Sequence, residues 1–446
     1  MPPFPSRAVR TSLATPLALL VMAWPMSLGA MAESIDAAAL TELTPEAAGR
    51  LVAEFPGVLV DLKGWGADLP GDALPLTGLK SLSSETANAL AAYDKGPLLL
   101  DGLTTISVEA IRGLTALRGG GLSLGGLKTL SADDARTLAE FKGHMLWLDG
   151  LTTLSPDAAR ALTDFKGAGM TFDGLNSLAA DVARTCAAFR GQVLSFSGLT
   201  TLPADVADAV ATFNGQVLFL DGLKTLTPES ARSLAAFKGQ TLALDGLVTL
   251  DVDAARALAA ARVKRLRLNG LTTLSADAAR ALSGFQGPLL HLDGLTTLSA
   301  ESAAALAGFE GKWLYLNGLT TLPADAGAMF AKFKGKGLFV RGLTALRPDA
   351  ARGLAACTAW DGQLPGIAAF EAADSVQVAA ALADRQGRLL LPNLKRISPK
   401  TLQALIRKED VQIPSLDELE LIPEPDGGPT EDFVIPEGFL ERQRRR

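Results

Sequence analysis

The sequence predicts a right-handed α/β solenoid with a parallel β-sheet on its concave face and short helices on its convex face. Two observations carry this prediction. A Gly-Leu pair returns every 24 residues from Gly78 to Gly342 without an insertion, and each repeat joins alternating leucines to a helix-start signal. A strict period of this length is typical of one supersecondary unit stacked on copies of itself, because a single unit cannot bury its own apolar face.

The repeat at residues 145–167 shows each element in order. Leu146 and Leu148 alternate with outward positions, which is the period-two pattern of a short strand with one buried face. A turn is expected at Gly150, because glycine tolerates backbone conformations that other residues resist. Ser155, followed by a proline, predicts the N-cap and first position of a helix of roughly ten residues.

The link between successive strands carries a helix, so the strands are expected to be parallel and the winding right-handed. A helix is about 10 Å wide with its side chains, whereas neighbouring strands lie about 4.8 Å apart. The stack should therefore bend, with the strands on the inner side.

The unit resembles a leucine-rich repeat over about residues 38–418, in an atypical, bacterial, exported 24-residue form. This resemblance implies a strand-helix solenoid that serves as a recognition surface. The usual pattern has an asparagine ladder two positions after the Leu-x-Leu strand. Here that slot holds glycine, and the residue before it is usually Asp or Asn.

The ends of the chain differ from the repeats. Arg7 and Arg10 precede an apolar stretch at 13–22 and the small-x-small pattern at 30–32, which predicts a signal peptide at 1–32. An uncleaved anchor is the alternative. We expect a secreted or periplasmic protein with no membrane span after signal cleavage. The further boundaries are a capping region at 33–77, regular repeats at 78–365, degenerate repeats and a C-terminal cap at 366–421, and a disordered tail at 422–446.

Composition and cysteine spacing exclude several functions. The net charge of −6 provides no basic footprint for nucleic acid. Cys186 and Cys357 occupy apolar core positions about seven repeats apart, too far for a disulfide, so both are expected to be free thiols that fill the core.

Catalytic signatures are weak. Ser123 lies in a G-x-S-x-G pattern but also in the ordinary strand register, without the strand-to-helix turn that exposes a nucleophile. His144 and His291 are six repeats apart, so no histidine triad or metal cluster is expected. The prediction is a protein that is not an enzyme, with no catalytic residue, metal or cofactor.

Acceptor side chains precede the turn glycines. Stacked carboxylates could bind calcium, which is one interpretation. At some repeats Asn or Ser replaces Asp at this position. These residue types share with Asp the ability to accept a hydrogen bond but not its charge, so a structural role in the turn is favoured. The column contains Asp101, Asp149, Asp173, Asp221, Asp245 and Asp293, with Asn269, Asn317 and Ser197 as substitutes.

The strongest functional signal is an outward strand column that varies while its inward neighbours stay leucine. Its later members, with their neighbours, mix aromatic and cationic groups as binding hot spots do, although neutral drift on a solvated face is an alternative. We therefore expect an exported scaffold that binds another protein through the concave strand face, or alternatively a carbohydrate or cell-envelope binding protein. The candidate ligand-binding residues are Trp147, Phe219, Arg265, Arg267, His291, Trp313, Tyr315 and Phe339.

Overall fold

The computed structural model describes residues 36–59, 72–117, 119–424, 435 and 437–439. The predicted signal peptide at 1–32 lies outside these residues, as does most of the predicted tail at 422–446. The chain forms two compact units, Met1–Gly174 and Leu175–Arg446, which are described separately.

The described part of unit one begins with the 3-10 helix η2 (Ala37–Ala39) and α1 (Pro45–Glu54), followed by β1 (Val58–Leu59) and β2 (Asp72–Pro75). β1 and β2 pair antiparallel, an exception to the expected parallel order, whereas β2 to β6 pair in parallel. The alternating elements are α2 (Ser84–Leu90), β3 (Leu98–Leu99), α3 (Val108–Leu114), β4 (Gly121–Ser123), α4 (Ala132–Leu138), β5 (Met145–Trp147), α5 (Pro156–Leu162) and β6 (Gly169–Thr171).

Unit two continues the same alternation, and β7 to β13 pair in parallel. Its elements are α6 (Ala180–Ala187), β7 (Val193–Ser195), α7 (Ala204–Val210), β8 (Val217–Phe219), α8 (Pro228–Leu234), β9 (Thr241–Ala243), α9 (Val252–Ala259), β10 (Arg265–Arg267), α10 (Ala276–Ser283), β11 (Leu289–His291), α11 (Ala300–Leu306), β12 (Trp313–Tyr315), α12 (Ala324–Phe330) and β13 (Gly337–Phe339).

The C-terminal part of unit two is less regular. β14 pairs in parallel with β16, and β15 with β17. Its elements are α13 (Pro348–Ala356), α14 (Ser375–Ala383), β14 (Leu389–Leu390), β15 (Arg396–Ile397), α15 (Pro399–Ile406), β16 (Val411–Gln412), η3 (Leu416–Glu418) and β17 (Glu420–Leu421).

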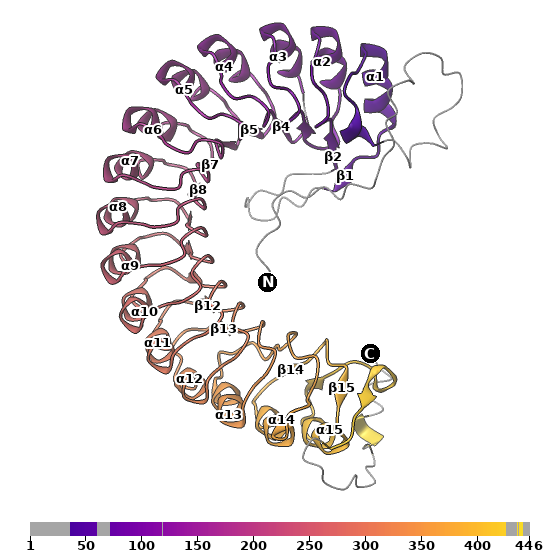
Figure 1. The fold of residues 1–446 in the computed structure, drawn as a ribbon, viewed down its shortest axis with the longest axis vertical. Helices are drawn as coiled ribbons and strands as arrows, with labels where there is room; N and C mark the ends of the chain where they lie inside the picture. Colours follow the sequence, from indigo (N-terminus) through magenta and orange to yellow (C-terminus); the bar gives the residue numbers. More distant parts are fainter. Residues whose placement is uncertain (1–35, 60–71, 118, 425–434, 436, 440–446) are drawn as a thin grey trace. The chain divides into compact units, whose positions relative to one another are not determined.

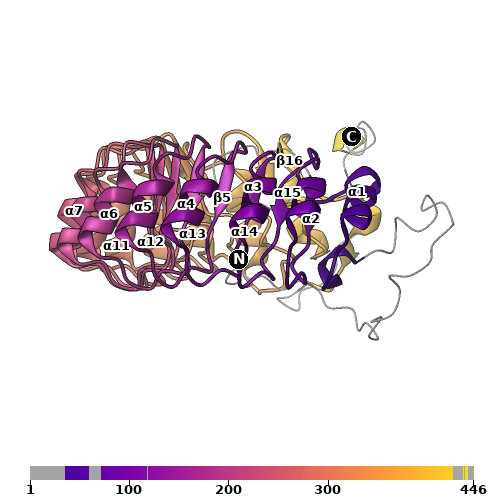
Figure 2. The ribbon, with the colours of Figure 1, turned by 90° about the horizontal axis from the view of Figure 1, so that it is seen from above.

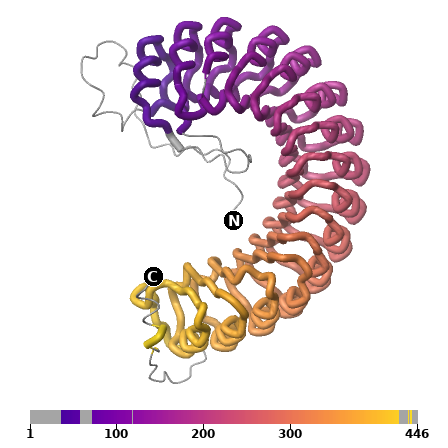
Figure 3. The backbone as a smooth tube through the Cα atoms, turned by 180° about the vertical axis from the view of Figure 1, so that it is seen from behind, coloured from indigo at the N-terminus to yellow at the C-terminus, as the bar shows by residue number. Residues whose placement is uncertain are grey.

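Within each unit the strands lie on the inner side of the coils and the helices on the outer side (Figure 1). Figure 2 shows the helices of unit one side by side, and Figure 3 shows each repeat as one turn of the backbone. Leu266 of β10 pairs with Leu290 of β11, and Leu290 pairs with Leu314 of β12. All three are 0% exposed. The predicted class, an α/β leucine-rich-repeat-like solenoid, is confirmed.

The predicted helix start is confirmed, but the helices of the regular repeats, α2 to α12, span seven or eight residues and are shorter than the expected ten. Ser155 Oγ accepts the backbone N–H of Ala158 at 3.2 Å, and α5 then spans seven residues. The α-helix ends where the backbone hydrogen bonds change from the i to i−4 pattern to the i to i−3 pattern of a 3-10 turn. An example is the 3.1 Å hydrogen bond from Phe165 N–H to the Leu162 carbonyl. This tighter turn directs Phe165 into the core, where it stacks on Phe141 with ring centroids 5.9 Å apart.

The turn glycines are required by crowding rather than by backbone conformation. Gly150 is not among the glycines with positive φ in the described residues, which are Gly57, Gly362 and Gly387. A Cβ at Gly150 would lie 2.2 Å from the carbonyl oxygen of Gly125 in the preceding repeat. Glycine therefore lets successive coils approach closely.

Both cysteines are free thiols, as predicted. Cys186 and Cys357 are each 2% exposed. Among the described residues, none of the helices combines the length and the apolarity that crossing a bilayer requires.

Candidate functional site

A hydrogen-bonded ladder runs along the strand ends of unit two. Asp221 Oδ1 accepts the backbone N–H of Asp245 at 2.8 Å, and Asp245 Oδ1 accepts that of Asn269 at 3.0 Å. Asn269 Oδ1 in turn accepts the N–H of Asp293 at 3.0 Å. The acceptor column that precedes the glycines thus joins each repeat to the next. An asparagine performs the same role, so the hydrogen bond does not require a charge.

Unit one contains the same kind of ladder, with a second contact on its carboxylates. Asp101 Oδ1 accepts the backbone N–H of Gly125 at 2.9 Å and also the hydroxyl of Ser123. Ser123 is 1% exposed. Its hydroxyl is therefore occupied by the ladder, which supports the view that the G-x-S-x-G pattern does not form a nucleophile site.

The ladder has an electrostatic consequence in unit two. Burial and the nearby Asp245 carboxylate raise the pKa of Asp221 to about 6, against the opposing effect of Arg267. Arg267 itself forms an ion pair with Asp245. Among the described residues, no group of three or more His, Cys, Asp and Glu side chains is arranged to hold a metal ion.

Two predicted site residues are covered, contrary to the expectation of an open strand face. Trp147 in unit one is 4% exposed, and its ring occupies the space beside Gly121, where a Cβ would lie 2.3 Å from Trp147 Cζ3. Phe219 in unit two is 5% exposed, and the guanidinium of Arg267 lies 5.8 Å from its ring centroid. Because Ala243 of the intervening strand is small, Arg267 can reach across it.

The other predicted residues lie on one face of four successive strands in unit two, β10 to β13. His291 pairs in register with Tyr315, and Tyr315 with Phe339. The rings stack with centroids 4.1 Å and 4.5 Å apart and planes tilted by 4° and 7°. We call these three side chains the ring column. Arg341, which the sequence analysis did not select, extends it, with its guanidinium 5.2 Å from the Phe339 centroid.

A second outward column runs beside the ring column. Arg265 pairs in register with Leu289, Leu289 with Trp313, and Trp313 with Gly337. Trp313 is 41% exposed. Its ring fills the space above Gly337, where a Cβ would lie 2.6 Å from Trp313 Cδ1. The structure thus brings together six of the eight predicted residues, Arg265, Arg267, His291, Trp313, Tyr315 and Phe339.

An ion pair holds part of this face: Arg341 Nε lies 2.8 Å from Asp361 Oδ2. His291 Nδ1 lies 3.6 Å from Asp293 Oδ2. His291 Nε2 is buried and has no hydrogen-bond partner within the described part of the chain. The strand face is therefore an ordered surface of rings and charges.

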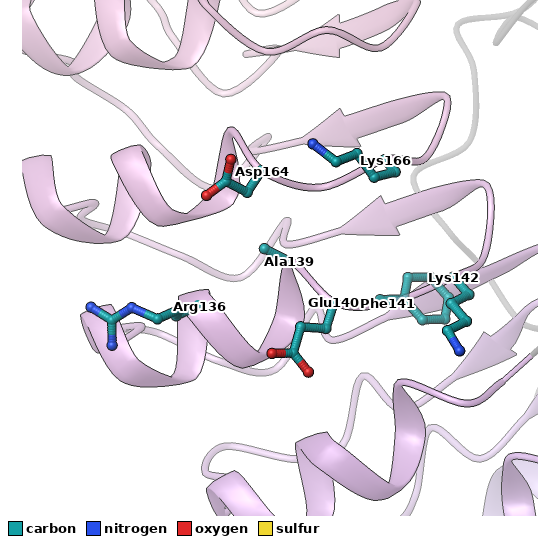
Figure 4. Close-up of a pocket in the computed structure, with 7 residues that line it drawn as sticks. All are labelled: Arg136, Ala139, Glu140, Phe141, Lys142, Asp164 and Lys166. Carbon is teal, nitrogen blue, oxygen red and sulfur yellow. The ribbon is translucent and has the colours of Figure 1, made fainter.

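A separate open pocket lies in unit one beside the ends of α4 and α5 (Figure 4). Its lining combines two carboxylates, three cations and two apolar side chains. Its lining residues are Arg136, Ala139, Glu140, Phe141, Lys142, Asp164 and Lys166.

The 24-residue register, the parallel sheets and the outer helices define an α/β solenoid with a leucine-rich-repeat-like fold. No protein-family model and no curated protein matches the sequence. Similar solved structures include an internalin from Listeria monocytogenes, 15% identical with a TM-score of 0.38, covering 65% of this chain and 84% of that chain.

Two further similar structures come from complexes. A chain of the mouse RP105/MD-1 complex is 15% identical to this chain, with a TM-score of 0.44. The match covers 80% of this chain and 68% of the chain from the complex. The Toll–Spatzle complex of Drosophila gives 13% identity and a TM-score of 0.36 over 76% of this chain. This chain spans 43% of the Toll-complex chain.

Proposed function

We propose that the protein is an exported repeat scaffold that binds another protein through the strand face of β10 to β13. The observation that carries this proposal is Trp313, which is 41% exposed beside a stacked ring column and an exposed Arg265. Tryptophan and arginine are enriched among residues that dominate binding energy at protein interfaces. Protein binding through this face requires no catalytic reaction.

Carbohydrate or cell-envelope binding is the second candidate, supported by the exposed indole of Trp313. The ring column itself favours it less. Tyr315 has His291 on one side and Phe339 on the other, at 4.1 Å and 4.5 Å between centroids. Sugar stacking requires an open ring face, and both faces of Tyr315 are covered.

Capture from cell-envelope extract tests the proposed function. We expect the full chain to retain a specific protein, and Trp313→Ala to lose it because truncation removes the apolar anchor. Val248→Ala is the matched control, since Val248 is 45% exposed in the same unit but lies outside β10 to β13. Equal capture by Trp313→Ala and the control would contradict the proposal.

A glycan array on the same variants separates the two candidates. Glycan binding that disappears in Trp313→Ala would favour the carbohydrate role. Export is tested by fractionating cells that express the full chain: recovery of the protein in the cytoplasmic fraction alone would contradict it.

A further inference from the structure

The segments that contain β10 to β13 have a net charge opposite in sign to that of the chain as a whole. The runs 264–269, 288–293, 312–317 and 336–341 contain six cations and one aspartate, a net charge of +5 with histidine neutral, whereas the whole chain carries −6. The equivalent runs of β7 to β9 in the same unit, 192–197, 216–221 and 240–245, contain two aspartates and no cation. Positive charge is therefore concentrated in the segments of β10, β12 and β13, whereas the β11 segment between them contains Asp293 and no Lys or Arg.

Only part of this charge is neutralised internally. Arg267 pairs with Asp245, and Arg341 pairs with Asp361. The other four cations are exposed and have no carboxylate partner within the described residues: Lys264, Arg265, Lys312 and Lys336. We call these four side chains the basic strand edge.

Spacing makes the basic strand edge a site for negative charge. Lys312 and Lys336 precede adjacent strands, and neighbouring strands lie about 4.8 Å apart. Cations at neighbouring backbone positions repel one another, and a partner with complementary charge reduces the repulsion and speeds association. Lys264 has one internal contact, a 3.2 Å hydrogen bond from its Nζ to Gln240 Oε1, which leaves its charge uncompensated.

Apolar surface lies among these charges. Trp313 follows Lys312 directly and is in register with Leu289 and Gly337. Because Gly337 has no side chain, the indole packs over this glycine, and Trp313 remains 41% exposed to a ligand that approaches along the strands. Trp313 and Arg265 lie on the outward face, and Lys264, Lys312 and Lys336 immediately precede their strands, so one apolar anchor lies beside four exposed cations.

The covered ring column favours a polypeptide over an anionic glycan. Phe339 has Tyr315 on one side and the Arg341 guanidinium on the other, at 4.5 Å and 5.2 Å. A glycan would have few ring faces for stacking. An extended acidic segment places a carboxylate on one side at every second residue, about 7 Å apart, which flexible lysine and arginine side chains can follow.

We propose that the basic strand edge binds an acidic, extended polypeptide segment of the partner protein, with Trp313 as the apolar anchor. This inference rests on the proposed protein-binding function and names the chemistry of the partner. Lys264, Arg265, Lys312 and Lys336 pair with its carboxylates.

Fluorescence anisotropy with labelled poly-L-glutamate tests the proposal on the full chain, with heparin as the glycan probe. The test variant reverses the basic strand edge: Lys264→Glu, Arg265→Glu, Lys312→Glu and Lys336→Glu. The control variant makes the same change in net charge at exposed lysines elsewhere: Lys142→Glu, Lys166→Glu, Lys224→Glu and Lys238→Glu. Circular dichroism confirms that both variants are folded.

We expect wild type and control to bind poly-L-glutamate, and the test variant to bind about tenfold more weakly or not at all. Binding should weaken between about 50 and about 200 mM salt, because screening reduces the attraction. Equal losses in both variants, no binding by wild type, or tighter binding of heparin than of poly-L-glutamate would overturn the proposal.

The experiments distinguish failure of the proposed scaffold function from failure of the acidic-partner proposal. A protein captured through Trp313 whose binding is unchanged by reversal of the basic strand edge would leave the scaffold function standing and refute the acidic partner. Loss of capture in both Trp313→Ala and the charge-reversed variant, with the control unaffected, supports both.

Discussion

Asp221 Oδ1 accepts the backbone N–H of Asp245 at 2.8 Å, so one carboxyl group joins two successive repeats of unit two. Burial and the Asp245 carboxylate raise its pKa to about 6 in the folded protein, against the opposing effect of Arg267. The unfolded value is about 3.9. Between these values the unfolded chain releases the proton while the folded chain retains it, so the contribution of Asp221 to stability falls as pH rises from about 4 to about 6 and then stays level.

Asp221→Asn should therefore stabilise the protein at neutral pH. Asparagine preserves the acceptor, as Asn269 does at 3.0 Å from the Asp293 amide, and it avoids a buried negative charge. We expect a higher midpoint of urea unfolding at about pH 7.5 and a weaker loss of stability between about pH 4 and about pH 6. Asp208→Asn, at an exposed aspartate, is the control. A destabilised Asp221→Asn would show that the Arg267 interaction outweighs burial.

Gly337→Ala should displace the indole of Trp313 with little loss of stability. The new Cβ would lie 2.6 Å from Trp313 Cδ1, and the exposed ring can rotate away. We expect the indole N–H resonance of Trp313, assigned with Trp313→Phe, to shift, and the free energy of unfolding to fall by about 1 kcal/mol. Gly308→Ala is the control because its nearest contact would be 3.2 Å. An unchanged resonance would contradict the packing of Trp313 over Gly337.

Neighbouring leucines of β11 should differ strongly in their contribution to stability. Leu290 points into the core at 0% exposure, whereas Leu289 lies on the outward face and is half-buried. Leu290→Ala should cost about 2–5 kcal/mol through lost burial and the cavity left behind, and Leu289→Ala less than about 1.5 kcal/mol. Urea unfolding measures both, and similar losses would contradict the assigned inward and outward faces.

The two thiols should be unreactive in the folded protein. Burial raises the pKa of Cys186 to about 12 and also raises that of Cys357. The thiolate is the reactive form, so little of it is present at neutral pH. We expect a thiol-specific disulfide reagent to leave the native chain unmodified and to label both cysteines in guanidinium. Rapid native labelling, or a mass that shows an oxidised pair, would contradict their buried positions.

Local sequence patterns predicted most of each repeat. Ser155 caps its helix as expected, and Leu146 is 0% exposed. The shorter helix was not predictable from the apolar spacing, because the backbone tightens only where Phe165 turns into the core. Trp147 and Phe219 were selected as exposed because alternation identifies the outward side of a strand. Alternation does not show that Gly121 leaves room for a flat indole, or that Arg267 extends over the phenyl ring.

The sequence by itself determined the solenoid, its 24-residue register and its free cysteines, because strict repetition places the inward apolar residue of each coil, usually a leucine, against its equivalent in the next coil. Tertiary structure alone decided which outward side chains are open and which are covered, and it showed that Asp221 joins neighbouring repeats. These relationships depend on side chains 22 to 24 residues apart, such as Arg267 and Asp245, whose reach is set by the size of the residues between them. A one-dimensional pattern contains the identity of those neighbours but not the distance between their atoms.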